Sequence, residues 1–387
     1  MKCYAAYAKD IEVRNLGSSG VIYPVIATEY IKKGGIVYAS VYDENLKVSF
    51  KRVDNIDDLS NTFTSKYMQS DSCCVYKKVK NDLKIGNKVL FCRTTCQVNG
   101  LYKYLSTCKV PMNSLLLIDI ICHGVPSYKV FYTYMKEYSD KKIATLNMRN
   151  KELGWDWYNY SWKIQFEDGT GKIEKQSKVP FMKGFVSNMF LRPSCYNCNS
   201  KKKRYSDITI GDFWGITNTN IKLDNRYGVS CIIVNTKKGE IGIDSIIPLL
   251  DIYETYYSDI LAYNPSLINS SRRPHNRKMF FNNINKCDSI ELLAEKANKS
   301  NGYNKIANKL YSKLNLGKIS TSDLTKKSGE RTMYKIKENC TGCMACNSVC
   351  PKKAIAIKCD NEGFCYPIIS LEKCINCGLC ENVCPQN

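Results

Sequence analysis

Apolar and polar positions alternate along the first 280 residues in the manner of an α/β chain. Short, largely apolar runs at residues 3–8, 36–42, 88–91 and 115–121 predict buried strands. The segment 21–33 and the stretch before Gly86 have the apolar spacing of amphipathic helices, and a further helix is expected after Pro126-Ser127. Strands that alternate with helices predict a mostly parallel sheet with both faces covered.

Later segments depart from this alternation. Residues 160–166 and 171–176, joined by Glu-Asp-Gly-Thr, predict an antiparallel hairpin, and 207–211 and 229–235 return as strands of the main body. From about residue 287 the chain is rich in Lys, Asn and Ser, with helices expected at 290–299 and 306–314. We therefore expect an α/β body with an antiparallel insertion at 1–285, a partly helical linker at 286–332 and a small α+β domain at 333–387.

Length and composition agree with a folded chain of two or three domains. The chain has 387 residues, of which 44% are hydrophobic. The longest apolar run, 115–122, is interrupted by Asp119 and is too short to cross a bilayer. No signal peptide is visible at the start, so a cytoplasmic location is expected.

The C-terminal segment contains one cysteine motif twice. Cys-x2-Cys-x2-Cys-x3-Cys-Pro occurs at 340–351 and again at 374–385. Three thiolates two residues apart wrap one corner of a cubane, while the fourth cysteine of each run ligates the other cluster. Neither a zinc site nor a chance arrangement of cysteines would require this spacing to occur twice. The motif predicts a ferredoxin-like domain with two [4Fe–4S] clusters, one held by Cys340, Cys343, Cys346 and Cys384, the other by Cys374, Cys377, Cys380 and Cys350.

Cysteine is abundant elsewhere too, with 21 in the chain. Without an export signal the thiols should stay reduced, which favours metal binding over disulfides. Cys359 and Cys365, in a hairpin expected between the two motif copies, are therefore interpreted as ordinary thiols.

Four cysteines of the main body have positions that suggest a third site. Cys96 and Cys122 follow predicted strands, and ligands gather at the carboxyl ends of parallel strands. Cys195-x2-Cys198 can add two ligands from one turn. These four thiols predict a third [4Fe–4S] cluster, although spacing alone leaves zinc binding, thiol exchange and inert thiols as alternatives.

The charge of the chain, formally +21, favours anionic partners. Acidic electron carriers of the ferredoxin or flavodoxin type and a small anionic substrate fit this charge. Nucleic acid is not expected, because the basic residues are spread along the chain apart from 201–204 and no nucleic-acid-binding motif occurs. Ser18-Ser19-Gly20, before the helix at 21–33, could bind phosphate through its backbone N–H groups; a simple helix cap is the plain alternative.

Together these segments resemble the coenzyme F420 hydrogenase/dehydrogenase beta-subunit family, which are flavin- and iron–sulfur-containing oxidoreductases related to 7-hydroxymethyl chlorophyll a reductase. The matching stretches are 18–20, 65–70, 95–97, 121–127, 192–198, 206–215 and 264–267. The chain departs from the family pattern at Val21, where a second Gly is usual, and at Arg93-Thr94-Thr95-Cys96, which replaces Gly-Thr-Pro-Cys. The ferredoxin module also follows the body, whereas in the family it commonly precedes it.

The resemblance implies one FAD in the body beside the third [4Fe–4S] cluster, with that cluster on Cys96, Cys122, Cys195 and Cys198. It places the flavin phosphates near Ser18, Ser19 and Gly20, with Lys66 as a cationic partner. The same cleft would be lined by Thr94, Thr95 and Gln97.

We therefore expect a flavin-dependent iron–sulfur oxidoreductase that passes electrons between a low-potential carrier, the clusters and FAD, to or from an organic substrate or coenzyme F420. His123 is the candidate proton donor, with a structural role as the alternative. The competing hypotheses are an electron-transfer subunit that docks onto a redox partner subunit without a substrate of its own, and a scaffold that has lost its flavin.

Overall fold

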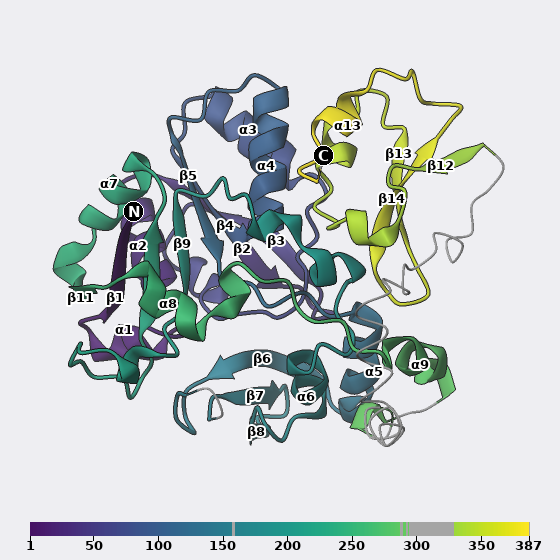
Figure 1. Ribbon diagram of the computed structural model, residues 1–387. Coiled ribbons are helices and arrows are strands. Elements are labelled where there is room, and N and C mark those ends of the chain that lie inside the picture. The colour runs from purple at the N-terminus through teal and green to yellow at the C-terminus, as the bar shows by residue number, and fades with distance from the viewer. Residues whose placement is uncertain (157–158, 287–288, 292, 294–328, 387) are drawn as a thin grey trace.

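The main body is built on a mixed sheet of eight strands. A computed structural model describes residues 1–156, 159–286, 289–291, 293 and 329–386 (Figure 1). The strand order is β11-β1-β10-β9-β5-β4-β2-β3. The bounds are β1 Lys2–Ala8, β2 Ile36–Tyr42, β3 Val48–Val53, β4 Val89–Thr94, β5 Leu115–Ile120, β9 Ile208–Asp212, β10 Ser230–Val234 and β11 Leu250–Glu254.

Parallel pairing occupies the centre of this sheet. Strands β2, β4, β5 and β9 are parallel neighbours, whereas β3 on one side and β10, β1 and β11 on the other pair antiparallel. The α/β class and the strands predicted along this part of the chain are confirmed. The antiparallel flanks come from β3 and β11, which were not predicted, and from long-range pairing of the first strand.

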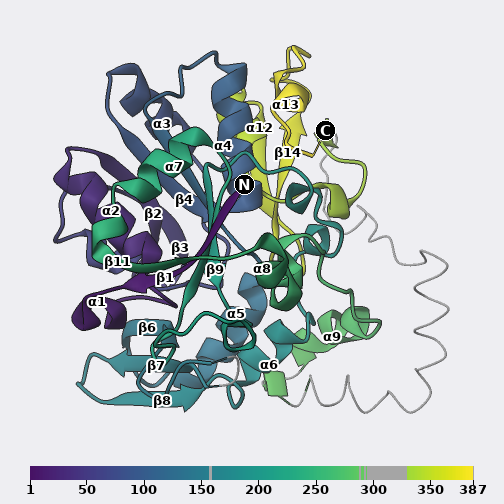
Figure 2. The ribbon, with the colours of Figure 1, turned by 60° about the vertical axis from the view of Figure 1, so that its left-hand side comes forward.

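Helices cover both faces of the sheet (Figures 1 and 2). Alternation along β2 shows why, since Val37 and Ala39 enter one core while Ile36 and Tyr38 enter the other. The first core is covered by α2 (Ile22–Lys32) and α7 (Lys237–Asp244), and the second by α3 (Val75–Lys84) and α4 (Thr95–Thr107). Short helices α1 (Ile11–Asn15) and α8 (Tyr257–Tyr263) follow β1 and β11.

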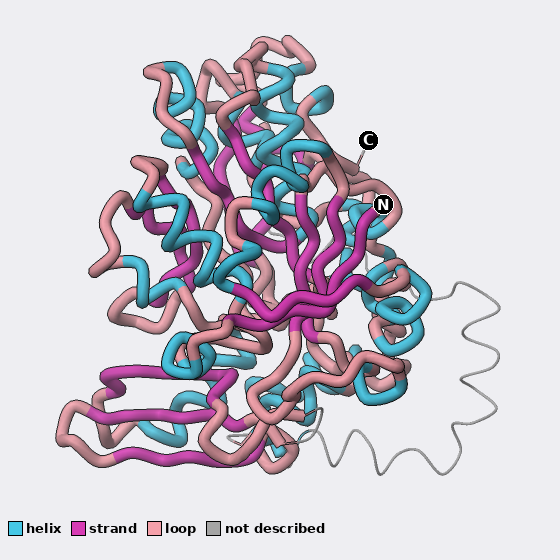
Figure 3. The backbone as a smooth tube through the Cα atoms, turned by 90° about the vertical axis from the view of Figure 1, so that its left-hand side faces the viewer, coloured by secondary structure: helices cyan, strands magenta, loops and turns pink. Residues whose placement is uncertain are grey.

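The insertion forms a separate antiparallel layer, seen below the main sheet in Figure 3. It consists of β6 (Ile143–Asn150), β7 (Ser161–Phe166) and β8 (Gly171–Lys175). The predicted hairpin is confirmed, and β6 adds a strand that the sequence did not reveal. Its aromatic core is shared with α5 (Tyr128–Met135), α6 (Pro180–Val186) and α9 (Arg277–Asn283).

The C-terminal region is a small α+β domain, as expected. Its sheet has the order β12-β14-β13, with β12 (Glu330–Thr332), β13 (Ile355–Cys359) and β14 (Cys365–Ser370), beside α12 (Ala345–Val349) and α13 (Leu379–Asn382). The sheet begins a few residues before the expected domain start at 333. The helices predicted at 290–299 and 306–314 lie almost wholly outside the described residues.

The interpretation of Cys359 and Cys365 as ordinary thiols is wrong, because the structure joins them in a disulfide. They are opposite each other at the end of the β13–β14 ladder. The sequence argument considered only the redox environment, whereas the strand register places these two sulfur atoms side by side.

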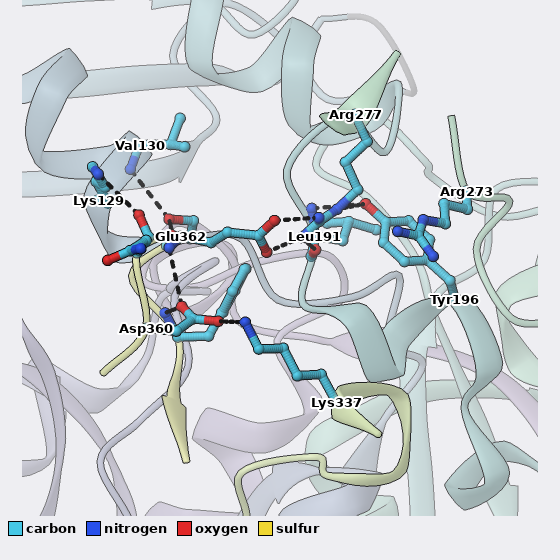
Figure 4. A network of polar contacts seen from close by, with 12 residues as sticks. Lys129, Val130, Leu191, Tyr196, Arg273, Arg277, Lys337, Asp360 and Glu362 are labelled. Carbon is cyan, nitrogen blue, oxygen red and sulfur yellow. Dashed lines mark hydrogen bonds and ion pairs between the residues drawn. The ribbon is translucent and has the colours of Figure 1, made fainter. Parts of the chain in front are cut away.

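The C-terminal domain packs against the body at several places, among them the segment around Arg192 before η3 (Pro193–Asn197). Its helix α12 lies against α3 and α4, and the β13–β14 turn reaches α5 and α9 (Figure 4). In that turn Glu362 forms a two-fold ion pair with Arg277, both contacts at 2.7 Å. The Ser127 hydroxyl donates to the Glu362 carbonyl and Lys129 donates to the carbonyl of Asn361 at 2.9 Å. Within the domain, the buried Lys337 pairs with Asp360 at 2.8 Å and thereby supports the turn.

None of the helices in the described ranges combines the length and the apolar character needed to cross a bilayer.

Candidate iron–sulfur and phosphate sites

The first cysteine set of the C-terminal domain lies around a single cavity of about 460 Å³. It consists of Cys340, Cys343, Cys346 and Cys384, of which Cys343 and Cys346 are buried. Burial, followed by the neighbouring thiols Cys343, Cys340 and Cys384, raises the pKa of Cys346 well above its usual value. The fourth cysteine of the second run thus joins the first three of the first run, the arrangement that a cubane requires.

The second set lines another cavity, of about 250 Å³. It contains Cys350, Cys374, Cys377 and Cys380. This set is nearer to solvent, since Cys377 is exposed whereas Cys343 and Cys346 are not. Each cavity therefore has four thiols, and both fit the chemistry of a [4Fe–4S] cluster.

The body thiols also converge. Cys96 lies in the first turn of α4, Cys122 follows β5, and Cys195 and Cys198 bracket the end of a 3-10 helix, η3 (Pro193–Asn197). Burial, followed by the thiols Cys198 and Cys122, raises the pKa of Cys96 well above its usual value. Burial and the thiols Cys122 and Cys198 likewise raise the pKa of Cys195 to about 12. Held as thiolates, these four groups would need a shared cation, and the core of an iron–sulfur cluster would supply one.

Polar groups of the backbone and a lysine surround this set. The Val125 N–H donates to Cys195 Sγ at 3.4 Å, and the Thr94 hydroxyl lies 3.5 Å from Cys96 Sγ. The buried Lys201 opposes the rise in the pKa of Cys122. Within the described residues, no three His, Cys or carboxylate side chains are arranged to hold a single metal ion.

His123 lies next to this set but is partly engaged elsewhere. Its Nε2 is 3.3 Å from the carbonyl of Phe185, and its ring lies edge-on to the Phe185 ring at 5.0 Å. Burial, followed by the charge of Lys201, lowers the pKa of His123, so the ring is neutral near pH 7. Hydrogen bonds to the Phe185 carbonyl and the Asn188 side chain oppose this fall in the pKa of His123.

The Ser18-Ser19-Gly20 segment forms a tight turn before α2. The Ser18 hydroxyl accepts from the N–H and hydroxyl of Ser65, at 3.2 and 3.0 Å. A side chain at Gly20 would meet the Ala6 carbonyl at 2.2 Å, so only glycine fits there. The next residue, Val21, has a φ of +66°, a conformation that is strained for a β-branched residue and costs about 1–2 kcal/mol.

Two lysines border this turn without a carboxylate partner in the described part of the chain. Lys66 directly follows Ser65, and its ammonium donates to the Thr64 carbonyl at 3.0 Å. Lys151 donates to the Ser19 carbonyl at 2.7 Å and to that of Arg14. Burial, followed by the charge of Arg93 or Arg14 respectively, lowers the pKa of each lysine to about 7. Buried cations without a counter-ion are costly, so this turn fits an anionic ligand such as a phosphate.

The three residues predicted to line the flavin cleft make hydrogen bonds within the protein interior. Gln97 is fully buried, accepts from Arg93 and Thr94, and donates to Ser70 and Ser72. The Thr95 hydroxyl donates to Asp119 at 2.6 Å. Their polar groups fix the start of α4, which carries Cys96.

Sequence reasoning missed Lys151 and gave Arg192 no role. Lys151 follows β6, a strand that was not predicted, and it reaches the Ser19 turn only through the packing of the insertion on the body. In the sequence, the only feature near Lys151 that could have suggested a role is Trp155, whose ring lies 5.0 Å from the ammonium group in the structure. Arg192 lies in a matched stretch of the resemblance, but most of its side-chain partners are in the C-terminal domain.

Two family models match parts of the chain. Residues 86–249 match the family model for the C terminus of the coenzyme F420 hydrogenase/dehydrogenase beta subunit, and residues 339–387 match that of a 4Fe–4S dicluster domain. No curated protein matches the chain. A solved chain from the F420-reducing [NiFe] hydrogenase complex of Methanosarcina barkeri is similar at 14% identity, with a TM-score of 0.45, over 65% of this chain and 81% of that one.

The dicluster match, together with the two cavities that each contain four thiols, indicates iron–sulfur electron transfer as the work of the C-terminal domain. The chain therefore contains a segment, residues 86–249, that matches the C terminus of the coenzyme F420 hydrogenase/dehydrogenase beta subunit, and a 4Fe–4S dicluster domain at residues 339–387.

Proposed function

We propose that the chain is an iron–sulfur flavoprotein oxidoreductase that exchanges electrons between a low-potential carrier and an organic substrate or coenzyme F420. The observation that carries the proposal is the convergence of four body thiols beside a domain with two further sets of four. When bound, [4Fe–4S] clusters transfer single electrons, and FAD converts such single electrons into a two-electron hydride transfer.

The body residues would hold the third cluster and the flavin. Cys96, Cys122, Cys195 and Cys198 supply the thiolates. Lys66 and Lys151 would neutralise phosphate at the Ser18–Gly20 turn, because both ammonium groups lack a carboxylate partner in the described residues. Phosphate would in turn raise the pKa of both lysines and keep them charged.

His123 is the proposed proton carrier for the organic substrate. Its contact with the Phe185 carbonyl fixes the orientation of the ring. A small anionic substrate agrees with the net basic charge.

The proposed partner is a small one-electron carrier of the ferredoxin or flavodoxin type, or a redox subunit with such a surface. The second cysteine set faces solvent beside exposed Lys352 and Lys373, which would attract an acidic protein. Leu371 and Ile375, 48% and 56% exposed, add apolar contact area. We also propose that the body at 1–285 and the ferredoxin domain at 333–387 are separate folding units joined by 286–332.

A direct test is anaerobic reduction of the purified chain by a chemically reduced acidic ferredoxin, followed at the flavin and iron–sulfur absorption bands. Bleaching of the flavin, followed by its reoxidation with F420 or another small acceptor, supports the enzyme. Reduced clusters with no small acceptor, together with a co-purifying redox subunit, support the electron-transfer subunit. A chain that takes up no flavin excludes the proposed function.

A further inference from the structure

Arg192 connects the body to the first cysteine set of the C-terminal domain. It precedes Cys195 near the start of η3, and the Cys195 N–H donates to the Arg192 carbonyl at 2.9 Å. Its side chain enters the C-terminal domain, where Nε donates to the Cys340 carbonyl at 2.9 Å and a terminal nitrogen donates to the Cys365 carbonyl at 2.8 Å. The same terminal nitrogen lies 3.9 Å from Cys340 Sγ. One residue thus joins a predicted ligand of the body cluster to a predicted ligand of the first C-terminal cluster.

The guanidinium of Arg192 is fixed on all sides. Its other terminal nitrogen donates to Gln69 Oε1 at 3.2 Å, and Gln69 in turn donates to the Thr341 carbonyl at 2.7 Å. The Tyr366 ring stacks at 4.4 Å from the guanidinium carbon. Gly342 makes room for it, since a side chain there would lie 2.7 Å from that carbon. This planar fork has several fixed partners that a lysine could not reproduce.

The charge of Arg192 has no carboxylate partner in the described residues, although only 1% of the residue is exposed. A guanidinium keeps its proton in proteins, so the charge persists despite burial. The other buried arginine of this interface, Arg277, is neutralised by Glu362. The ionisable groups closest to the guanidinium of Arg192 are therefore a cysteine sulfur and the Tyr366 phenol.

The first cysteine set, and not the second, faces the body. On α4, Cys96 and Gly100 are one turn apart on the same side of the helix. A side chain at Gly100 would lie 3.0 Å from Cys343 Sγ. The second set contains the exposed Cys377. The first set and Arg192 therefore lie between the body thiols and the second set.

We propose that Arg192 is a positioning residue that stabilises the reduced state of the cluster held by Cys340, Cys343, Cys346 and Cys384. A bound cluster gains one negative charge on reduction, and a fixed cation beside one of its sulfur ligands favours that state. Arg192 itself makes and breaks no bond. The inference deepens the proposed function, but it depends only on the presence of the C-terminal cluster.

The test is an EPR-monitored redox titration of the full, anaerobically purified chain carrying Arg192→Gln, with Arg277→Gln as the matched control. Both variants remove a buried guanidinium from the same interface, but only Arg192 lies against a predicted cluster ligand. R192Q should shift the potential of one C-terminal cluster to more negative values, whereas R277Q should leave both C-terminal potentials unchanged. Arg192→Lys, which keeps the charge without the fork, should recover part of the shift.

Three results would overturn the inference: unchanged potentials in R192Q with clusters loaded, equal shifts in R192Q and R277Q, or no recovery in R192K. If R192Q loses its iron, the cluster potential is measured in R192K instead, with Arg277→Lys as the control. The inference is supported if one C-terminal potential lies below that of the parent in R192K but not in R277K. A potential in R192K equal to that of the parent overturns it.

The titration needs neither flavin nor substrate. A chain without flavin would therefore refute the proposed function, while the potentials of R192Q and R277Q would still decide the role of Arg192.

Discussion

The Arg277–Glu362 pair should hold the β13–β14 turn of the ferredoxin domain on the body, and Glu362→Gln tests this (Figure 4). Both carboxylate oxygens lie 2.7 Å from guanidinium nitrogens, and the side chains are only 2% and 15% exposed. Removing one charge of a buried pair leaves the other uncompensated, at a cost of about 3 kcal/mol. The amide introduced by E362Q would keep one acceptor oxygen, so the loss of free energy comes mainly from the missing negative charge. At 1.4 kcal/mol per tenfold change, the turn should open from the body roughly a hundredfold more often, while α12 and Arg192 keep the rest of the domain in place.

Hydrogen exchange measured by mass spectrometry reads out this loss. Peptides covering 127–130 and 360–364 should exchange faster in E362Q, because the turn leaves α5. Glu330→Gln is the matched control, since Glu330 pairs with Lys358 inside the domain and such a pair contributes at most about 1 kcal/mol. Equal exchange in E362Q and the parent, or equal effects of E362Q and E330Q, would refute the reasoning.

Three further predictions concern the cofactor sites and the partner surface. Lys66→Met and Lys151→Met should each lower flavin content without loss of iron. In the parent chain flavin should be held most tightly below pH 7 and released as pH rises, up to about tenfold per unit for each lysine, because ammonium groups with a pKa of about 7 lose their charge above it; flavin retained equally from acid to alkaline pH would contradict this. Cys122→Ser should remove about four irons per chain and one EPR signal while the two C-terminal signals persist; a full iron complement would contradict it. Lys352→Glu with Lys373→Glu should slow reduction by an acidic carrier roughly tenfold at low salt, with the difference vanishing at high salt; a salt-independent effect would indicate damage to the cluster and not to docking.

Much of the architecture follows from local patterns in the sequence. The strands around residues 36–42 and 115–121 are apolar runs that favour burial of their side chains, and α2 has apolar residues that pack against the sheet. The doubled motif indicates which cysteine crosses between the two sets, because cubane geometry constrains the spacing, and the same cysteines line the two cavities.

Other features depend on contacts that no local pattern contains. Strand β1 pairs with β10 and β11, more than 200 residues away, and these antiparallel neighbours extend the sheet beyond its parallel centre. Lys151 and Arg192 acquire their contacts only through packing between distant segments. The Cys359–Cys365 disulfide follows from strand register, which a redox argument does not address.

The most direct test of the central claim is the content of iron, sulfide and flavin per chain after strictly anaerobic purification, with EPR after reduction by dithionite. Three sets of four thiols and a phosphate-binding turn predict about twelve irons and about one FAD, since each cubane holds four irons. About eight irons and no flavin would contradict the account, because the chemistry would then be confined to the C-terminal domain.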